Sequence, residues 1–236
     1  MKIALLGYGR MGKEIEKIAL QRRHEIVLKV SGEESYDISV ADVAIDFSIP
    51  SAAYQNITNC FQNKVPVISG TTGWLEKYDD AIAVCKEHSG SFIYASNFSL
   101  GVNIFFELNK HLSKMMNALE DYKVSMEEIH HTKKLDAPSG TAITLAEGII
   151  ENSSKEKWQL ETENSSVQQD EIPIVAKRIP DVPGTHVINY DSEVDSIEIK
   201  HTAHSRKGFA LGAVVAAEWL IGKTGVYTMK DVLNIG

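Results

Sequence analysis

The sequence predicts an α/β protein with two parts, a doubly wound parallel sheet and a second α+β domain with a mixed, largely antiparallel sheet. Short apolar strands alternate with helical patterns from residue 2 to about residue 95, which is typical of parallel sheets. Polar or glycine-rich runs come after these strands, at the sheet edge where such proteins bind ligands. The second part is predicted from strands joined by short connections, which favour antiparallel pairing.

The predicted elements run along the chain in order. Strands of the first part are expected at residues 2–6, 25–30, 43–47, 65–69 and 92–95. The second part is expected to contain a long helix after Gly101, a strand over 124–129, a helix over 142–151, and strands at 172–179, 185–190 and 196–203. An apolar helix is expected over 209–221. Because residues 152–171 are polar and lack periodicity, an irregular surface stretch is expected there.

Composition limits the class of protein. The chain has 24 Lys and Arg against 32 Asp and Glu, a net charge of −8, so nucleic acid is not an expected partner. The apolar run at the N-terminus is broken by Gly7, too early for a signal peptide, and no later stretch approaches the ~20 apolar residues of a membrane span. Cys60 and Cys85 have no C-x-x-C partner, so buried reduced thiols in a cytoplasmic protein are expected, with no metal site.

A glycine-rich turn comes directly after the first strand. Gly7-Tyr8-Gly9-Arg10-Met11-Gly12 lies between that strand and a helical pattern with Ile15 and Ile18. In this setting the first glycine permits a tight turn, the second lets the backbone approach a pyrophosphate, and the third lets the helix pack close to the strand. The turn therefore predicts a Rossmann-type dinucleotide site.

The choice between NADH and NADPH depends on the residues directly after the second strand. A carboxylate there suits the ribose of NAD, whereas Arg or Lys suits the 2′-phosphate of NADP. The chain has Ser31-Gly32-Glu33-Glu34 at this place, with the acidic pair a little too far along, and Lys13 or Lys29 is available as a positive charge. The sequence leaves this choice open.

The stretch from Glu127 to Thr141 concentrates several reactive groups. It contains His130-His131, Lys133-Lys134 and Pro138-Ser139-Gly140-Thr141, directly before a helical pattern. The amides of Ser139, Gly140 and Thr141 are then expected at a helix N-terminus, which suits a carboxylate or phosphate. One segment thus combines an anion site, a cation and a proton donor.

This stretch closely resembles the catalytic signature of the dihydrodipicolinate reductase family, also called 4-hydroxy-tetrahydrodipicolinate reductases. Further segments match the family in order and spacing: Asp46-Phe47-Ser48, Gly70-Thr71-Thr72-Gly73 and Ala95-Ser96-Asn97-Phe98-Ser99. The resemblance implies reduction of 4-hydroxy-2,3,4,5-tetrahydrodipicolinate, a small dicarboxylate, by NADH or NADPH in lysine and diaminopimelate biosynthesis. It also implies a homotetramer, a dinucleotide-binding domain at 1–98 and 207–236, and a substrate-binding and oligomerisation domain at 99–206.

The resemblance also implies roles for individual residues. His130 and Lys134 would be catalytic, with His130 as the general acid because its reference pKa is ~6.5 and Lys134 as the cation. The substrate-binding residues would be His131, Ser139, Gly140, Thr141 and Thr72. The cofactor-binding residues would be Gly7, Gly9, Arg10, Met11, Gly12, Phe47, Gly70, Thr71, Thr72, Ala95, Asn97, Phe98 and Arg206.

Two other functions are compatible with the glycine turn. One is a different small-substrate dehydrogenase, such as a homoserine or aspartate dehydrogenase, which would not be expected to carry His-His-x-x-Lys before Pro-Ser-Gly-Thr. The other is a non-catalytic dinucleotide sensor, which has no use for the cationic signature.

Overall fold

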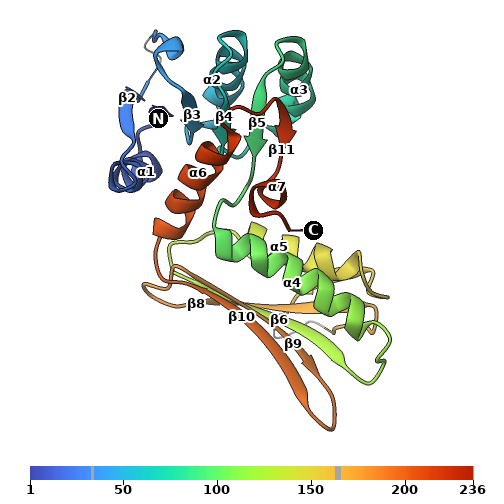
Figure 1. Ribbon diagram of the computed structural model, residues 1–236. Helices are drawn as coiled ribbons and strands as arrows, with labels where there is room; N and C mark the ends of the chain where they lie inside the picture. Colours follow the sequence, from blue (N-terminus) through green and yellow to red (C-terminus); the bar gives the residue numbers. More distant parts are fainter. Residues whose placement is uncertain (33–34, 163–165, 236) are drawn as a thin grey trace. The chain divides into compact units, whose positions relative to one another are not determined.

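The computed structural model describes residues 1–32, 35–162 and 166–235, and the chain forms two compact units (Figure 1). The first unit contains residues 1–103 and 206–236, and the second contains residues 104–205. Within the described ranges, the helices lack the length and apolar character that a bilayer-spanning segment requires.

The first unit is built on a six-stranded sheet in the order β11-β5-β4-β3-β1-β2. All its pairings are parallel. Its strands are β1 (Lys2–Leu6), β2 (Glu25–Val30), β3 (Val43–Asp46), β4 (Val67–Ser69), β5 (Ser91–Tyr94) and β11 (Gly225–Tyr227). The predicted parallel sheet is confirmed, and β11, which the sequence pattern did not identify as a strand, extends it beside β5.

Helices cover both faces of this sheet. They are α1 (Arg10–Gln21), α2 (Pro50–Gln62), α3 (Tyr78–Glu87), α6 (Lys207–Leu220) and α7 (Met229–Leu233), with short 3-10 turns η1 (Ile38–Val40) and η2 (Leu75–Lys77). Successive residues of β1 alternate between two cores: Ile3 and Leu5 pack with α1 and α6, while Ala4 and Leu6 pack with α2 and α3. This alternation is what a doubly wound sheet requires.

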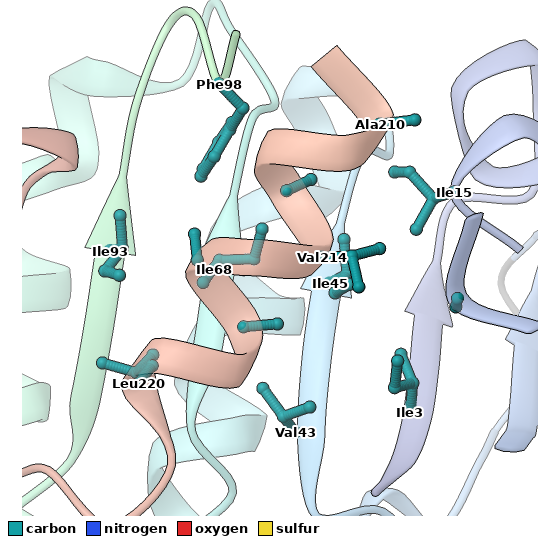
Figure 2. Packing of buried hydrophobic residues seen from close by; sticks show 14 of the residues in the cluster. Ile3, Ile15, Val43, Ile45, Ile68, Ile93, Phe98, Ala210, Val214 and Leu220 are labelled. Carbon is teal, nitrogen blue, oxygen red and sulfur yellow. The ribbon is translucent and has the colours of Figure 1, made fainter. Parts of the chain in front are cut away.

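Helix α6 completes the first core, although it lies far along the chain. Figure 2 shows Val214 of α6 beside Ile45 of β3, and both belong to one buried cluster with Ile68 of β4 and Leu220 of α6. Arg22 near the end of α1 donates two hydrogen bonds, of 2.8 and 2.7 Å, to the carboxylate of Glu218 in α6. The first unit is therefore assembled from both ends of the sequence.

The second unit is a five-stranded mixed sheet in the order β10-β9-β6-β8-β7. Its strands are β6 (Lys123–His130), β7 (Lys157–Leu160), β8 (Glu171–Arg178), β9 (Gly184–Asp191) and β10 (Ser196–Ala203). Helices α4 (Leu100–Met116) and α5 (Gly140–Ile150) supply apolar side chains to its core. Leu112 of α4 and Leu145 of α5 pack there with Met126 of β6 and Ile188 of β9.

Two predictions about this unit are wrong. Residues 152–171 are not wholly irregular, because β7 lies within them and pairs in parallel with β8. Strands β8 and β9 do not pair despite their short connection, since β6 lies between them. The connecting residues 179–183 are enough to cross one strand, a distance of about 10 Å between the outer two. Among the residues that the structure describes, the antiparallel pairs of this sheet are β6 with β9 and β9 with β10.

Candidate active site

The glycine turn after β1 has the geometry that the sequence predicts. Gly7 has a positive φ of 95°, and a Cβ there would lie 2.1 Å from the carbonyl oxygen of Phe47. A Cβ on Gly12 would lie 2.3 Å from the oxygen of Gly7, so α1 packs against the turn. Gly9 is the N-cap of α1 and has open space around it. The free backbone amides at such a helix start form a site for an anion such as a pyrophosphate.

A cavity of about 310 Å³ lies beside this turn, in the first unit. The turn, the loop after β3 and the loop after β4 all line it. The lining residues are Gly9, Arg10, Met11, Phe47, Ser48, Pro50, Gly70, Thr71 and Thr72. Most of the predicted cofactor residues therefore surround one cavity.

A buried carboxylate joins two of these loops. Asp46, at the end of β3, is fully buried and accepts hydrogen bonds from side chains on both sides of the cavity. The donors are Ser48 Oγ at 2.7 Å, Asn56 Nδ2 at 3.1 Å, Ser69 Oγ at 2.8 Å and Thr71 Oγ1 at 2.7 Å. Burial raises the pKa of Asp46, while these four hydrogen bonds act in the opposite direction.

The other predicted cofactor residues lie outside the cavity lining. Phe98 is 1% exposed and packs against Phe47, with the ring centroids 5.8 Å apart. The Asn97 side-chain oxygen accepts a hydrogen bond of 2.9 Å from the Ser99 amide, which shapes the turn before α4. Ala95 is half-buried directly after β5, and Arg206 is the exposed N-cap of α6.

Lys29, which was available as a positive charge for a 2′-phosphate, is already paired. Its ammonium lies 2.5 Å from Glu16 Oε1 and 4.9 Å from the centre of the Tyr8 ring. The Tyr8 hydroxyl also donates to Glu16. Lys13, the other available cation, is exposed, and Glu33 and Glu34 lie outside the described residues.

The signature occupies the end of β6 and the start of α5, in the second unit. His130 is the last residue of β6, and Ser139 is the N-cap of α5. The Ser139 hydroxyl accepts a hydrogen bond of 3.1 Å from the Ala142 amide, which is the usual side-chain cap. The predicted helix N-terminus at Ser139, Gly140 and Thr141 is therefore present.

Glu128 lies at the centre of this region. Its Oε2 accepts a hydrogen bond of 3.0 Å from the Ser139 amide, and its Oε1 accepts one of 3.1 Å from Arg178 Nη2. His130 Nδ1 lies 3.4 Å and His186 Nε2 lies 3.7 Å from Oε2. His186 Nε2 is also 3.1 Å from the Ser139 hydroxyl. The Ser139 amide, expected to be available to a ligand, is thus occupied by a carboxylate of the chain itself.

The two titratable groups of β6 have shifted pKa values. Burial acts to raise the pKa of Glu128, but hydrogen bonds from His186 and Ser139 and the charge of His130 lower it to about 2. Burial lowers the pKa of His130, Glu128 raises it, and His186, Lys134 and Arg178 lower it, with a result of about 4. At neutral pH Glu128 is therefore anionic, and the His130 imidazole is neutral, whereas its reference pKa implies that a minor fraction is protonated.

The remaining substrate candidates differ in their surroundings. Lys134 is half-buried, and its ammonium lies 2.8 Å from Asp136 Oδ2. An added Cβ at Gly140 would meet no atom within 4 Å, so the start of α5 is open there. His131 is half-buried just after β6, and its Nδ1 has no partner among the described residues. Thr72 is exposed and belongs to the first unit.

The sequence interpretation assigned no site role to five residues of these networks: Asn56, Ser69, Glu128, Arg178 and His186. A signal for Glu128 was present, because its position in β6 continues the buried alternation of Val124 and Met126. In such a strand every second residue faces the core and is expected to be apolar. An acidic residue at one of these positions indicates a buried carboxylate that has hydrogen-bond partners. No comparable pattern marked Arg178, whose contacts depend on the parallel pairing of β8 with β6.

Comparisons with known proteins show which family this chain resembles. Residues 1–98 match the family model for the dihydrodipicolinate reductase N-terminus, and residues 101–233 match the model for its C-terminus. The 4-hydroxy-tetrahydrodipicolinate reductase of Christiangramia forsetii is 60% identical over 99% of this chain and 98% of that protein. The enzyme of the same name from Methanoregula boonei is 35% identical over 82% of this chain and 75% of that protein.

A solved structure shares the fold. The dipicolinate-bound dihydrodipicolinate reductase from Paenisporosarcina sp. TG-14 has a TM-score of 0.77 and 23% sequence identity, and the match covers 97% of both chains. The two family models span both units, and the curated relatives match along most of the sequence. The chain therefore belongs to the dihydrodipicolinate reductase family.

Proposed function

We propose that this chain reduces 4-hydroxy-2,3,4,5-tetrahydrodipicolinate to 2,3,4,5-tetrahydrodipicolinate, with loss of water, in lysine and diaminopimelate biosynthesis. The chain is a dinucleotide-dependent oxidoreductase by family. The observation that carries the proposal is the signature region, where His130, Lys134 and the start of α5 belong to one unit built around Glu128.

The dinucleotide is proposed to bind in the first unit. Gly7, Gly9 and Gly12 leave the start of α1 open to a pyrophosphate, and the 310 Å³ cavity adjoins it. When bound, the reduced nicotinamide supplies the hydride. Glu16 already neutralises Lys29, whereas Lys13 is exposed, so NADH or NADPH is proposed as the hydride donor.

The two carboxylates of the substrate need donors. The amides of Gly140 and Thr141 at the start of α5 suit one of them, because a helix N-terminus favours an anion. His131 and Thr72 are proposed as further donors. The Ser139 amide is not proposed as a substrate donor, since it already donates a hydrogen bond to Glu128.

His130 is proposed to donate the proton that accompanies hydride transfer. In the ligand-free chain its pKa of about 4 keeps it neutral at pH 7. A substrate that brings two negative charges close to the imidazole raises this pKa, because nearby anions favour the charged form. His130 then takes up a proton as the substrate binds and can release it to the reacting ring, while the ammonium of Lys134 stabilises negative charge that develops there.

We also propose that the chain works in the cytoplasm as a homotetramer, with domains at 1–98 with 207–236 and at 99–206. Strand β10 lies at the edge of the second sheet and is largely exposed, and an exposed edge strand is able to pair with another subunit. The packing of α6 in the first core supports a discontinuous first domain.

The direct test is turnover of substrate made freshly by the preceding synthase from pyruvate and aspartate semialdehyde. Oxidation of NADH and of NADPH is monitored by absorbance, with Lys134→Ala as the comparison. Turnover that is lost in Lys134→Ala supports the reductase, and the ratio of the two rates reports the cofactor preference. Tight dinucleotide binding without turnover contradicts the proposal and favours a sensor.

A further inference from the structure

The carboxylate of Glu128 is fully buried, on the face of β6 that also carries Val124, Met126 and His130. Glu128 is 0% exposed, and Val124 and Met126 precede it on the same face of β6. Burying a charged carboxylate costs several kcal/mol unless it is paired. The groups that pair with this carboxylate therefore indicate its role.

Glu128 is hydrogen-bonded to the last residue of the loop that connects β6 with α5. The Ser139 amide donates to Glu128 Oε2 at 3.0 Å, so the carboxylate fixes the residue that caps α5. Arg178 Nη2 donates to Glu128 Oε1 at 3.1 Å and to the carbonyl oxygen of Asp136 at 2.6 Å. The segment between Asp136 and Ser139 is thereby attached to both β6 and β8. These are charge-assisted hydrogen bonds, which are stronger than neutral ones.

Glu128 also faces the ring of His130. The two residues lie on the same buried face of β6, with His130 Nδ1 3.4 Å from Glu128 Oε2. The His186 ring packs edge-on against His130, with the centroids 5.1 Å apart. On the Nε2 side of the ring, an added Cβ on Gly184 would lie 3.1 Å from His130 Nε2. The imidazole is thus confined by β9, and its buried Nδ1, which makes no hydrogen bond among the described residues, lies 3.4 Å from the Glu128 carboxylate.

A metal site is the other reading of this cluster, because Glu128, His130 and His186 place one ligand atom each within 4.8 Å of one another. The contacts argue against it. Both oxygens of Glu128 already accept N–H donors, from Ser139 and Arg178. The guanidinium of Arg178 also supplies the positive charge that a cation would bring.

We propose that Glu128 is a positioning residue of the active site, whose carboxylate orients the His130 ring through Nδ1 and fixes the start of α5 through the Ser139 amide. This inference rests on the proposed function, in which His130 is the proton donor and α5 holds a substrate carboxylate. One carboxylate then keeps the donor and the anion site in a single geometry. With Nδ1–H directed at Glu128, Nε2 is the atom that takes up and releases the proton.

The charges around His130 make the proposal testable by pH. Glu128 on its own strand acts to raise the pKa of His130, while His186 on β9, Arg178 on β8 and Lys134 in the loop act to lower it. Replacing Glu128→Gln removes the group that raises the pKa and keeps the size of the side chain. The fall of kcat/KM with rising pH that is assigned to His130 should then occur at lower pH.

The experiment compares Glu128→Gln with Glu127→Gln in the full chain. Glu127 is the neighbouring carboxylate, which instead pairs with Lys177. For Glu128→Gln we expect kcat to fall about 10- to 100-fold, by analogy with carboxylates that orient metal-bound histidines, with a higher KM for the substrate and an unchanged Kd for NADH. Equal kcat values and pH profiles in the two variants would overturn the proposal.

A second measurement covers the case in which Glu128→Gln fails to fold. The tautomer of His130 in the wild-type chain is read from the ring nitrogen shifts of ¹⁵N-histidine-labelled protein at neutral pH, assigned with His130→Gln. The expected tautomer carries its proton on Nδ1, and a proton on Nε2 would contradict the inference. Because this needs no turnover, it separates a failure of the orienting role from a failure of the reductase function.

Discussion

The hydroxyl of Thr71 donates a hydrogen bond of 2.7 Å to the buried carboxylate of Asp46, and the same hydroxyl accepts one of 2.9 Å from the Ser48 amide. Asp46 ends β3, Ser48 lies in the loop after it, and Thr71 lies in the loop after β4. Both loops line the cavity of the first unit. The shape of the proposed dinucleotide site therefore depends on one carboxylate that does not line it.

Replacing Asp46→Asn should weaken both the first unit and its cofactor site. The amide group has one acceptor oxygen where the carboxylate has two, so the pair of donors at one of the two Asp46 oxygens loses its acceptor there. We expect the free energy of unfolding to fall by about 1–3 kcal/mol, the cost of an unsatisfied buried polar group, and the Kd for NADH to rise. Urea unfolding and fluorescence titration measure these. The exposed Asp80→Asn is the control, and equal behaviour of the two variants would contradict this account.

Replacing His130→Gln should lower kcat by about 10²- to 10⁴-fold, the usual range for a lost acid or base. The pH dependence gives a sharper result. A general acid with a pKa of about 4 in the free enzyme makes kcat/KM fall as pH rises above that value, whereas kcat reports the substrate complex and should break at a higher pH. Both dependences should be absent in His130→Gln. The exposed His204→Gln should keep them, and their loss there would contradict the assignment.

Sequence periodicity predicted which segments form strands and helices better than it predicted which of these segments lie side by side. The strands around Gly7 and His130 were identified because strand alternation and turn residues are local properties. The central position of β6 in its sheet was not predicted, because the connection between β8 and β9 is short whether or not a strand lies between them. For the same reason the sequence marked Lys134 but not Arg178, whose contact with Glu128 exists only through pairing between distant strands.

The pKa shift of His130 also depends on tertiary structure. The reference value of ~6.5 is the correct expectation for an imidazole in water. Burial lowers it, Glu128 raises it, and His186, Lys134 and Arg178 lower it, and only folding buries the ring and brings His186 and Arg178 to it. The residue type was therefore predictable from the sequence, but its protonation state was not.

Acid should destabilise the second unit in two steps. The folded pKa of His130 is lowered from 6.5 to about 4, so between these values the unfolded chain binds a proton that the folded chain does not, and stability falls as pH falls. The pKa of Glu128 is lowered from 4.5 to about 2, so its contribution is present above pH 4.5 and is lost as pH falls toward 2. Each step should lower the free energy of unfolding by on the order of 1–3 kcal/mol.

Chemical unfolding at several pH values, monitored by far-ultraviolet circular dichroism, tests this expectation. His130→Gln should remove the step between pH 6.5 and 4, because glutamine does not titrate. His204→Gln, at an exposed position, should retain it. An identical pH dependence in the wild-type chain and His130→Gln would show that His130 does not carry the effect.

The first unit should fold as one body only when both of its segments are present. Core residues of α6, among them Val214 and Leu220, pack against β1, β3 and β4. A Cβ on Gly208 would lie 3.7 Å from the Ser99 hydroxyl, so the start of α6 is close to the start of α4. Residues 1–103 joined to 206–236 by a short Gly-Ser linker should therefore unfold cooperatively and bind NADH.

Residues 1–103 alone should do neither, because the apolar face of the sheet that α6 covers would be left in water. Within the joined protein, Leu220→Ala should cost about 2–5 kcal/mol, the usual range for a buried leucine, since Leu220 is 0% exposed. Ile221→Ala at the next position, 41% exposed, should cost much less. Cooperative unfolding of residues 1–103 without α6 would contradict a discontinuous domain, because it would show that the first segment completes its own core.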